Sequence, residues 1–246
     1  MSGEHILDLV GPEPDRVLRI SSAPTGVVDV YDPPAASTSG DLVVLIHGGF
    51  WRAAYDRTHL RVLAAAIAAT GRRVALPEYR RIGDPGGGWP GTLDDIIDLV
   101  ASVPGLLGSE PRQTVLVGHS AGGHLAVLAA QRADRPPRMV VSLAGVLDLA
   151  AAHRDGLSRG VVAELLGAAH PTAASIAAAD PMAAPIPSVE VRVIHGDDDT
   201  EVPPGYSAAY AARDPRIGIE MLAGIDHYDV IDPRSTAFDA LLRAIG

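Results

Sequence analysis

The 246-residue sequence predicts an α/β fold in which a mostly parallel sheet of about eight strands is flanked by helices. Apolar runs of strand length alternate along the chain with longer segments of helical periodicity, a pattern typical of parallel sheets with helical crossovers. The run Leu42–Ile46 is apolar at every position, as expected for a strand buried on both faces. Apolar residues make up 47% of the chain, which is enough for a sizeable core.

The predicted elements follow one another in a regular order. The expected strands are Val27–Val30, Leu42–Ile46, Val74–Leu76, Val115–Val117, Met139–Leu143, Val191–Ile194 and Ile219–Leu222. The expected helices are Thr58–Ala69, Thr92–Val103, Gly122–Arg132 and Ser235–Ile245. Gly71 is well placed to end the first helix, and Thr92 with two nearby aspartates is typical of a helix start.

The segment 150–185 is rich in alanine and interrupts the alternation of strands and helices. The sequence has no internal repeat and no linker long enough to divide it. We therefore expect a single domain over residues 1–246, in which residues 150–185 form a short insertion that acts as a partial lid.

The composition disfavours several classes of function. The net charge of −10 leaves no basic stripe for nucleic acid, and the absence of cysteine excludes disulfides, thiolate metal sites and cysteine nucleophiles. The N-terminal stretch is acidic and interrupted by prolines, unlike a secretory signal, and the longest apolar run, Ala64–Ala69, is too short for a membrane span. We expect a cytoplasmic protein without nucleic-acid or membrane partners.

The turns that follow the apolar runs are the places to look for chemistry, because open α/β sheets bind ligands beyond the carboxyl ends of their strands. Residues 118–122 read Gly-His-Ser-Ala-Gly between an expected strand and an expected helix. This context suits a nucleophile, because Ser120 would occupy a strained turn with a helix N-terminus behind its hydroxyl group. The alternative is a glycine-rich turn whose serine only caps the helix.

A serine nucleophile needs a base and an acid that orients the base. Three aspartates, residues 197–199, follow one of the expected strands, and His227 follows the last one. The alternative for the aspartates is a solvated acidic loop, which could bind a cation. Asp226 and Asp229 flank the histidine, but such close sequence neighbours are poorly placed to reach its Nδ1 from behind.

The loop after Leu42–Ile46 reads His-Gly-Gly-Phe-Trp at residues 47–51. Its glycines give the backbone the freedom to turn amide groups inward and to approach a substrate closely. We expect the amides of Gly49 and Phe50, together with that of Ala121 at the start of the serine helix, to form an oxyanion hole.

The other histidines near these turns have different expected roles. His47 is expected to support its loop by hydrogen bonding, and His119 to pack beside the serine turn or line the pocket. A metal site formed by His47, His195 and the aspartates is an alternative that lacks a recognised ligand spacing.

Taken together, the four turns resemble those of the α/β-hydrolase superfamily over nearly the whole chain. Within it, the His-Gly-Gly loop with Phe50 and Trp51, the segment Glu78–Arg81 and the segment GGGWPGTLDD at residues 86–95 resemble kynurenine formamidases (arylformamidases) and their esterase relatives. Esterases similar to hormone-sensitive lipase carry a third glycine at the position of Phe50.

The resemblance implies a catalytic triad. In this superfamily the nucleophile, the acid and the base follow one another in that order along the chain. The stretch that begins at His195 is also similar to the family pattern H-G-x-x-D-x-x-V-P. The triad is then Ser120 as nucleophile, Asp199 as acid and His227 as base, without a cofactor or a metal ion.

The resemblance also implies a serine hydrolase that cleaves a small acyl amide or ester. The first prediction is an arylformamidase that converts N-formylkynurenine to kynurenine and formate, and the alternative is a carboxylesterase acting on short-chain or aryl esters. The expected pocket residues are Trp51, Tyr79, Trp89, His119 and Tyr228, with Phe50 beside them. A catalytically silent binding module is disfavoured because all three triad residues are present. The expected partner is a small-molecule substrate, and the superfamily also allows a homodimer.

Overall fold

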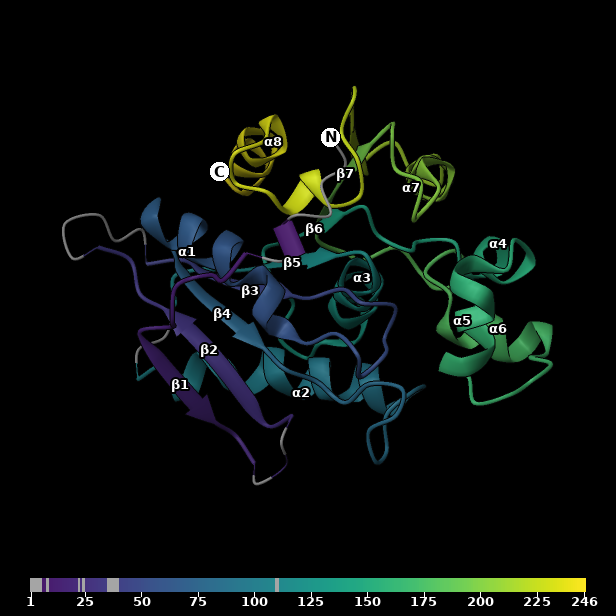
Figure 1. Ribbon diagram of the computed structural model, residues 1–246, viewed down its shortest axis with the longest axis horizontal. Helices are drawn as coiled ribbons and strands as arrows, with labels where there is room; N and C mark the ends of the chain where they lie inside the picture. The colour runs from purple at the N-terminus through teal and green to yellow at the C-terminus, as the bar shows by residue number, and fades with distance from the viewer. Residues whose placement is uncertain (1–5, 8, 22, 24, 35–39, 109–110) are drawn as a thin grey trace.

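The computed structural model describes residues 6–7, 9–21, 23, 25–34, 40–108 and 111–246, so part of the N-terminal stretch considered above lies outside it. Its centre is an eight-stranded sheet in the order β1-β2-β4-β3-β5-β6-β7-β8 (Figure 1). The strands are β1 Arg16–Arg19, β2 Val27–Tyr31, β3 Leu42–Ile46, β4 Arg73–Pro77, β5 Thr114–His119, β6 Met139–Leu143, β7 Glu190–Gly196 and β8 Gly218–Leu222. Strands β3 to β8 are parallel, whereas β2 is antiparallel to both of its neighbours, which confirms the predicted mostly parallel sheet.

Helices cover both faces of the sheet, with α1 and α8 on one face and α2 and α3 on the other (Figure 1). The four helices are α1 Arg61–Ala69, α2 Gly91–Leu106, α3 Ala121–Arg132 and α8 Thr236–Ile245. Strand β3 shows why this arrangement needs a continuous apolar run. Val43 and Leu45 join the core beneath α1 and α8, whereas Val44 and Ile46 join the core beneath α2 and α3.

The start of the first helix differs in detail from the prediction. A 3-10 turn over Arg57–Leu60 precedes α1, and Oδ1 of Asp56 accepts a hydrogen bond from the amide of Thr58 at 2.9 Å. Aspartate therefore provides the N-cap, because its side chain satisfies an amide that has no acceptor within the helix. Gly71 has a φ of 101° just after the helix, in agreement with its predicted role as a terminator.

Thr92 does not cap α2 as predicted, because Pro90 precedes the first helical residue. Its hydroxyl group instead accepts a hydrogen bond from the amide of Gly88 at 3.0 Å and donates one to the carbonyl oxygen of Arg80 at 2.6 Å. Thr92 thus connects the glycine-rich segment before α2 to the segment that follows β4.

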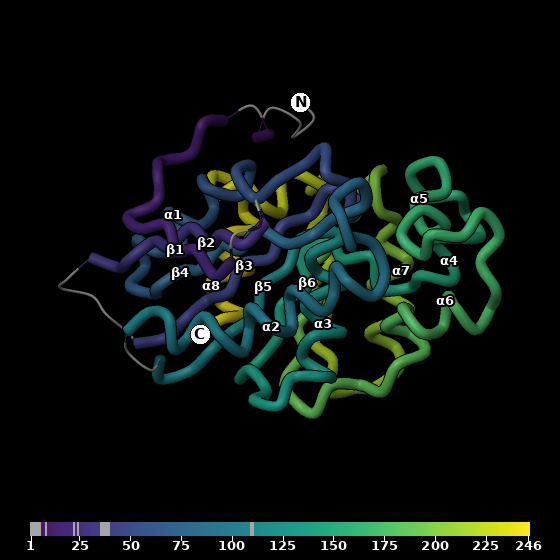
Figure 2. Tube along the Cα trace, turned by 90° about the horizontal axis from the view of Figure 1, so that it is seen from below, coloured from purple at the N-terminus to yellow at the C-terminus, as the bar shows by residue number. Residues whose placement is uncertain are grey.

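The segment between β6 and β7 contains three short helices at one end of the molecule, visible in both views (Figures 1 and 2). They are α4 Leu149–Arg154, α5 Leu157–Leu165 and α6 Ala173–Ala179. Strand β1 and helix α7, Pro204–Ala211, were not predicted from the sequence. No helix in the described part of the chain is both long and apolar enough to cross a membrane.

The strand order places the first two candidate loops next to each other. After β3 the chain adds β4 on one side, and β5 then pairs with β3 on the other side. The carboxyl ends of β3 and β5 therefore lie at the point where the strand order reverses, which is where such sheets bind ligands.

Candidate active site

The turn between β5 and α3 holds Ser120 in a strained conformation. Ser120 has φ 55° and ψ −119°, a region that residues with a side chain rarely adopt. A Cβ on Gly118 would lie 2.2 Å from the carbonyl oxygen of Gly122, and a Cβ on Gly122 would lie 2.2 Å from that of Ile46. Only glycine fits at these two positions, which explains the spacing around the serine.

His227 and Asp199 come together from the loops after β8 and β7. Nδ1 of the buried His227 lies 2.7 Å from Oδ2 of Asp199. When Nδ1 donates this hydrogen bond, Nε2 remains an acceptor. His227 and Ser120 line the same cavity, so the three residues predicted from separate turns are brought to one place.

Asp199 has a second histidine partner, which the sequence analysis missed. Nε2 of His195 lies 3.0 Å from Oδ2 of Asp199 and 3.0 Å from the carbonyl oxygen of Val202. Both neighbours are acceptors, so Nε2 carries the proton, and Nδ1 accepts from the hydroxyl group of Ser207 at 2.7 Å. The signal was present in the His-Gly-x-x-Asp pattern, which begins with His195.

The surroundings of Asp199 keep it ionised. Burial alone raises the pKa of this carboxyl group, but the hydrogen bonds from His195, His227 and the amide of Val202 outweigh burial and hold the pKa well below its usual value. The amides of Glu201 and Val202 both donate to Oδ1, at 2.9 and 2.8 Å. A buried negative charge at this position can stabilise a positive charge on His227.

The other acids near the histidine lie in different surroundings. Asp197 is exposed and accepts a hydrogen bond from the amide of Gly224 at 2.7 Å, and Asp198 is exposed beside it. Asp226 accepts two backbone amides of its own turn at 2.8 Å each. Of the five aspartates considered in the sequence, Asp199 makes the hydrogen bond to the histidine ring.

The loop after β3 contributes Gly49 and Phe50 to the cavity wall. Gly49 and Phe50 have φ values of 105° and 52°, and within the described residues neither amide donates a hydrogen bond to the protein. Ala121 is the first residue of α3, where the amide has no acceptor within the helix. The amide of Ile82 donates to the carbonyl oxygen of Trp51 at 2.7 Å and fixes the loop from outside.

His47 supports this loop, as predicted. Its Nδ1 lies 2.8 Å from the carbonyl oxygen of Gly48, and its Nε2 lies 2.8 Å from Oε1 of Glu78. The ring of Tyr79 stacks on His47 at 4.3 Å and its hydroxyl group donates to the His47 carbonyl oxygen at 2.8 Å. A Cβ on Gly48 would lie 2.9 Å from Cβ of Ser120, which shows how closely the supported loop approaches the serine.

Glu78 is the buried anion beneath the loop. Its carboxylate accepts a hydrogen bond from the amide of Arg57 at 3.1 Å and lies 3.1 Å from the guanidinium group of Arg81. Burial raises the pKa of Glu78, but the hydrogen bond to His47 and the charges of His47 and Arg81 outweigh burial and lower it.

We predict that Glu78→Gln destabilises the protein by about 3 kcal/mol at pH 7, because it removes the buried negative charge that faces the guanidinium group of Arg81 and the ring of His47. The lowered pKa means that Glu78 contributes stability above the unfolded value of 4.5, and loses it as the pH falls through the folded pKa. The difference from the native protein should therefore shrink below pH 4.5. Urea unfolding of the native protein and the variant at several pH values measures this difference in the free energy of unfolding.

The matched control for this experiment is Glu220→Gln, which removes a half-exposed carboxylate that lies 2.8 Å from Arg243. Exposed ion pairs contribute about 0–1 kcal/mol, so this change should have a small effect at every pH. Equal losses of stability for the two variants would contradict a structural role for Glu78.

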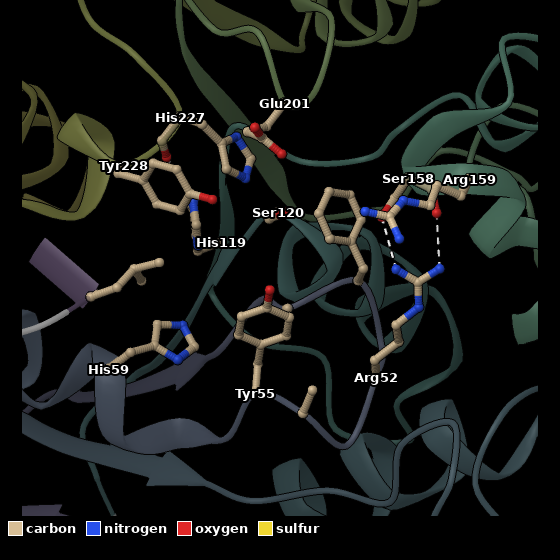
Figure 3. Close-up of a pocket in the computed structure, with 14 residues that line it drawn as sticks. Arg52, Tyr55, His59, His119, Ser120, Ser158, Arg159, Glu201, His227 and Tyr228 are labelled. Carbon is tan, nitrogen blue, oxygen red and sulfur yellow. Dashed lines mark hydrogen bonds between the residues drawn. The ribbon is translucent and has the colours of Figure 1, made fainter. Parts of the chain in front are cut away.

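A cavity of about 360 Å³ opens at Ser120 (Figure 3). It is lined by Leu7, Gly49, Phe50, Arg52, Ala54, Tyr55, His59, His119, Ser120, Ser158, Arg159, Glu201, His227 and Tyr228. Figure 3 shows His227, His119 and Tyr228 on one side of the serine, and Ser158 and Arg159 on the other. The expected pocket residues His119 and Tyr228 are thus found in the cavity wall.

His119 and His59 give the cavity neutral polar walls. Burial, and then the nearby His227 and His59, hold the pKa of His119 well below its usual value. Burial and the neighbouring His47 lower the pKa of His59 to about 4. Nε2 of His119 lies 3.0 Å from the carbonyl oxygen of His227, so His119 can donate to the backbone that carries the base.

The structure places three of the expected pocket aromatics elsewhere. Trp51 is fully buried and packs edge-on against His124 at 5.1 Å, and Tyr79 is fully buried beneath His47. Trp89 lies against Arg132 at 5.2 Å, and its amide donates to the carbonyl oxygen of Leu165 at 2.7 Å. These rings pack in the core or anchor a loop, because aromatic side chains bury more apolar area there.

Several cavity residues were not identified from the sequence: Arg52, Tyr55, His59, Ser158, Arg159 and Glu201. They come from loops, from the 3-10 turn before α1 and from the irregular start of α5, where periodicity carries no information about side-chain direction. Arg52 and Tyr55 lie just after the His-Gly-Gly-Phe-Trp loop, and this proximity in the sequence was the one feature that could have indicated a place in the cavity wall. The described residues contain no group of three or more side chains that could hold a metal ion.

A family model described as BD-FAE matches residues 28–213, well over half of the chain. The match begins at β2 and ends just after α7, so it includes the β3 loop, the serine turn and the acid loop.

Curated relatives match only part of the chain. The putative acetyl-hydrolase LipR of Mycobacterium tuberculosis is 36% identical over 121 residues, which is 48% of this chain and 37% of that protein. The carboxylesterase/phospholipase LipF of the same species is 34% identical over 119 residues, which is 47% of this chain and 31% of that protein. The match therefore spans about a third of the length of these relatives.

Solved structures match over nearly the full length. Esterase B from Lactobacillus rhamnosis has a TM-score of 0.79 at 18% identity and covers 99% of this chain and 88% of its own. An esterase from Thermogutta terrifontis has a TM-score of 0.68 at 21% identity, with coverage of 94% and 91%. At such identities the likeness establishes the α/β-hydrolase fold.

Proposed function

The chain belongs to the BD-FAE family within the α/β-hydrolase superfamily, and from this premise we propose that it is a serine carboxylesterase acting on small esters. One observation carries the proposal. Ser120 is held at a φ of 55° on a strand-to-helix turn and opens into a cavity that His227, hydrogen-bonded to the buried Asp199, also lines.

The proposed reaction proceeds through an acyl-enzyme. Ser120 Oγ attacks the acyl carbon while His227 Nε2 accepts its proton, and Asp199 stabilises the resulting imidazolium. The amides of Gly49, Phe50 and Ala121 donate to the oxyanion that forms. The intermediate expels the alcohol, which takes the proton from His227. Water then attacks the acyl group by the same steps and releases the acid and Ser120.

An ester substrate has more support than the formamide substrate of an arylformamidase. The named relatives are an acetyl-hydrolase and a carboxylesterase/phospholipase. The formamide prediction also relied on a wall of aromatic rings for the leaving group, and Trp51 and Tyr79 are in the core instead. The comparisons thus favour the alternative given by the sequence over its first prediction.

The proposal is tested by mixing the enzyme with 4-nitrophenyl acetate and following product release. We expect a burst of about one equivalent of 4-nitrophenolate if deacylation is slow, and covalent labelling of Ser120 by diethyl 4-nitrophenyl phosphate in a peptide map. The kcat/KM for 4-nitrophenyl butyrate should exceed that for N-formylkynurenine.

Two outcomes would overturn parts of this proposal. Absence of both turnover and labelling at Ser120 would exclude a serine hydrolase. If Ser120 is labelled but kcat/KM is higher for N-formylkynurenine than for all short esters, the protein is an arylformamidase and the esterase assignment is wrong.

A further inference from the structure

An unusual turn forms the cavity wall opposite His227. Ser158, Arg159 and Gly160 in α5 have consecutive φ values of 44°, 60° and 84°. A left-handed backbone is unfavourable for the two residues that carry a side chain, so the turn needs support from its surroundings.

Arg52 provides that support from the loop after β3. Its guanidinium group donates to the hydroxyl group and the carbonyl oxygen of Ser158 at 2.8 Å each, and to both carboxylate oxygens of Glu164 at 2.8 Å each. The planar fork of an arginine suits such paired acceptors. Four of the five N–H groups of Arg52 are therefore engaged in holding the turn, although the residue lines the cavity.

The supported turn presents Arg159 to the cavity. Arg159 is exposed, and within the described part of the chain it forms no ion pair and donates no hydrogen bond. Figure 3 shows its guanidinium group directed inward from the side of Ser158, whereas Glu201 lies across the cavity near His227. The cavity at Ser120 thus contains a cation that has no anionic partner among the described residues.

We propose that Arg159 binds a carboxylate group of the substrate, so that the preferred substrates are small esters that also carry a free carboxylate. This inference rests on the proposed esterase function. A guanidinium group matches a carboxylate with two parallel hydrogen bonds. A monoanion is favoured over a phosphate dianion, because Arg159 is the one unpaired cation among the described residues that line the cavity, and Glu201 adds an opposing charge there.

The size of the cavity limits the substrate further. A volume of about 360 Å³ is near the lower end of the range for ligand pockets. We therefore expect the ester and the carboxylate to belong to one small molecule.

The test uses pairs of esters that differ in charge. One pair carries the charge on the alcohol side: 4-acetoxybenzoate against neutral 4-acetoxybenzamide. A second pair carries it on the acyl side: mono(4-nitrophenyl) adipate against 4-nitrophenyl hexanoate. A third compound, 4-acetoxyphenylphosphonate, distinguishes a carboxylate site from a phosphate-type site. The measured quantity is the ratio of kcat/KM for the charged ester to that for its neutral partner.

We expect Arg159→Gln to lower this ratio by about 5- to 50-fold for at least one carboxylate pair, a range between an exposed ion pair and a shielded charged hydrogen bond. Intrinsic differences in reactivity between the two esters of a pair cancel when the native enzyme is compared with the variant, because they affect both ratios equally. Arg159→Lys should give an intermediate ratio, since it retains the charge but loses the fork. Arg154→Gln is the matched control, because Arg154 is exposed on the same insertion and lies outside the cavity wall.

The outcomes separate this inference from the esterase proposal. If the native enzyme hydrolyses neutral esters through Ser120 but the ratio is the same in Arg159→Gln, the carboxylate site is wrong and the esterase stands. A larger loss for the phosphonate than for both carboxylates would also overturn it. If Ser120→Ala retains full activity on the neutral esters, the esterase proposal itself fails.

Discussion

Replacing Ser120 by alanine is expected to lower kcat for 4-nitrophenyl butyrate by a factor on the order of 10⁶, which is the scale of loss when a serine nucleophile is removed. The hydroxyl group is the atom that would form the acyl-enzyme, so the oxyanion amides alone cannot replace it. Stability should change little, because alanine is smaller and the strained backbone conformation at this position is retained. Steady-state kinetics measures kcat, and thermal unfolding followed by circular dichroism measures the stability.

Ser142 offers a matched control for this substitution. It is a buried serine on β6, paired in register with Gly118 beside the serine turn, and its hydroxyl group has no hydrogen-bond partner in the described structure. Ser142→Ala removes the same atom from the adjacent strand and should keep kcat within about threefold of the native value, because that hydroxyl group contacts no proposed catalytic atom. A comparable loss in both variants would show that packing, and not nucleophilicity, explains the effect at Ser120.

Asp199→Asn is expected to lower kcat by about 10⁴, because an amide at this position presents an N–H group where two histidines already donate. His227 would then adopt the other tautomer, with Nε2 protonated and unable to accept the proton of Ser120. The KM should change much less than kcat, since Asp199 is buried behind the histidine and does not line the cavity.

The neighbouring Asp198 is the control for this prediction. Asp198→Asn makes the same chemical change one residue earlier, at an exposed side chain. It should leave kcat within about twofold, as expected for an exposed residue away from special contacts. A large effect on kcat at Asp198 with little effect at Asp199 would show that Asp199 is not the acid of the triad.

The sequence was most informative where the backbone itself imposes the residue type. Gly118 and Gly122 have no room for a Cβ, and Gly71 has a left-handed conformation, so their spacing could be recognised without coordinates. Strands such as β3 were equally clear, because burial on both faces requires an uninterrupted apolar run.

Other features depend on contacts between distant segments and leave no local pattern. Strand β1 is a short edge strand with alternating partly buried and exposed residues, so its burial signal is weak. Trp51 and Tyr79 were assigned to the pocket because they are aromatic residues beside the loops, but the direction of a side chain in an irregular loop is set by packing. Arg159 reaches the cavity through a left-handed turn that depends on Arg52, more than a hundred positions earlier in the chain.

The four hydrogen bonds of Arg52 have a consequence for engineering this protein. They connect the loop that carries Gly49 and Phe50 to the insertion that carries Ser158 and Glu164. A replacement of the insertion to admit bulkier substrates would also remove an anchor of the amides proposed to stabilise the oxyanion. Substrate range and turnover are therefore linked traits, and libraries that vary the insertion should keep Ser158 and Glu164 constant.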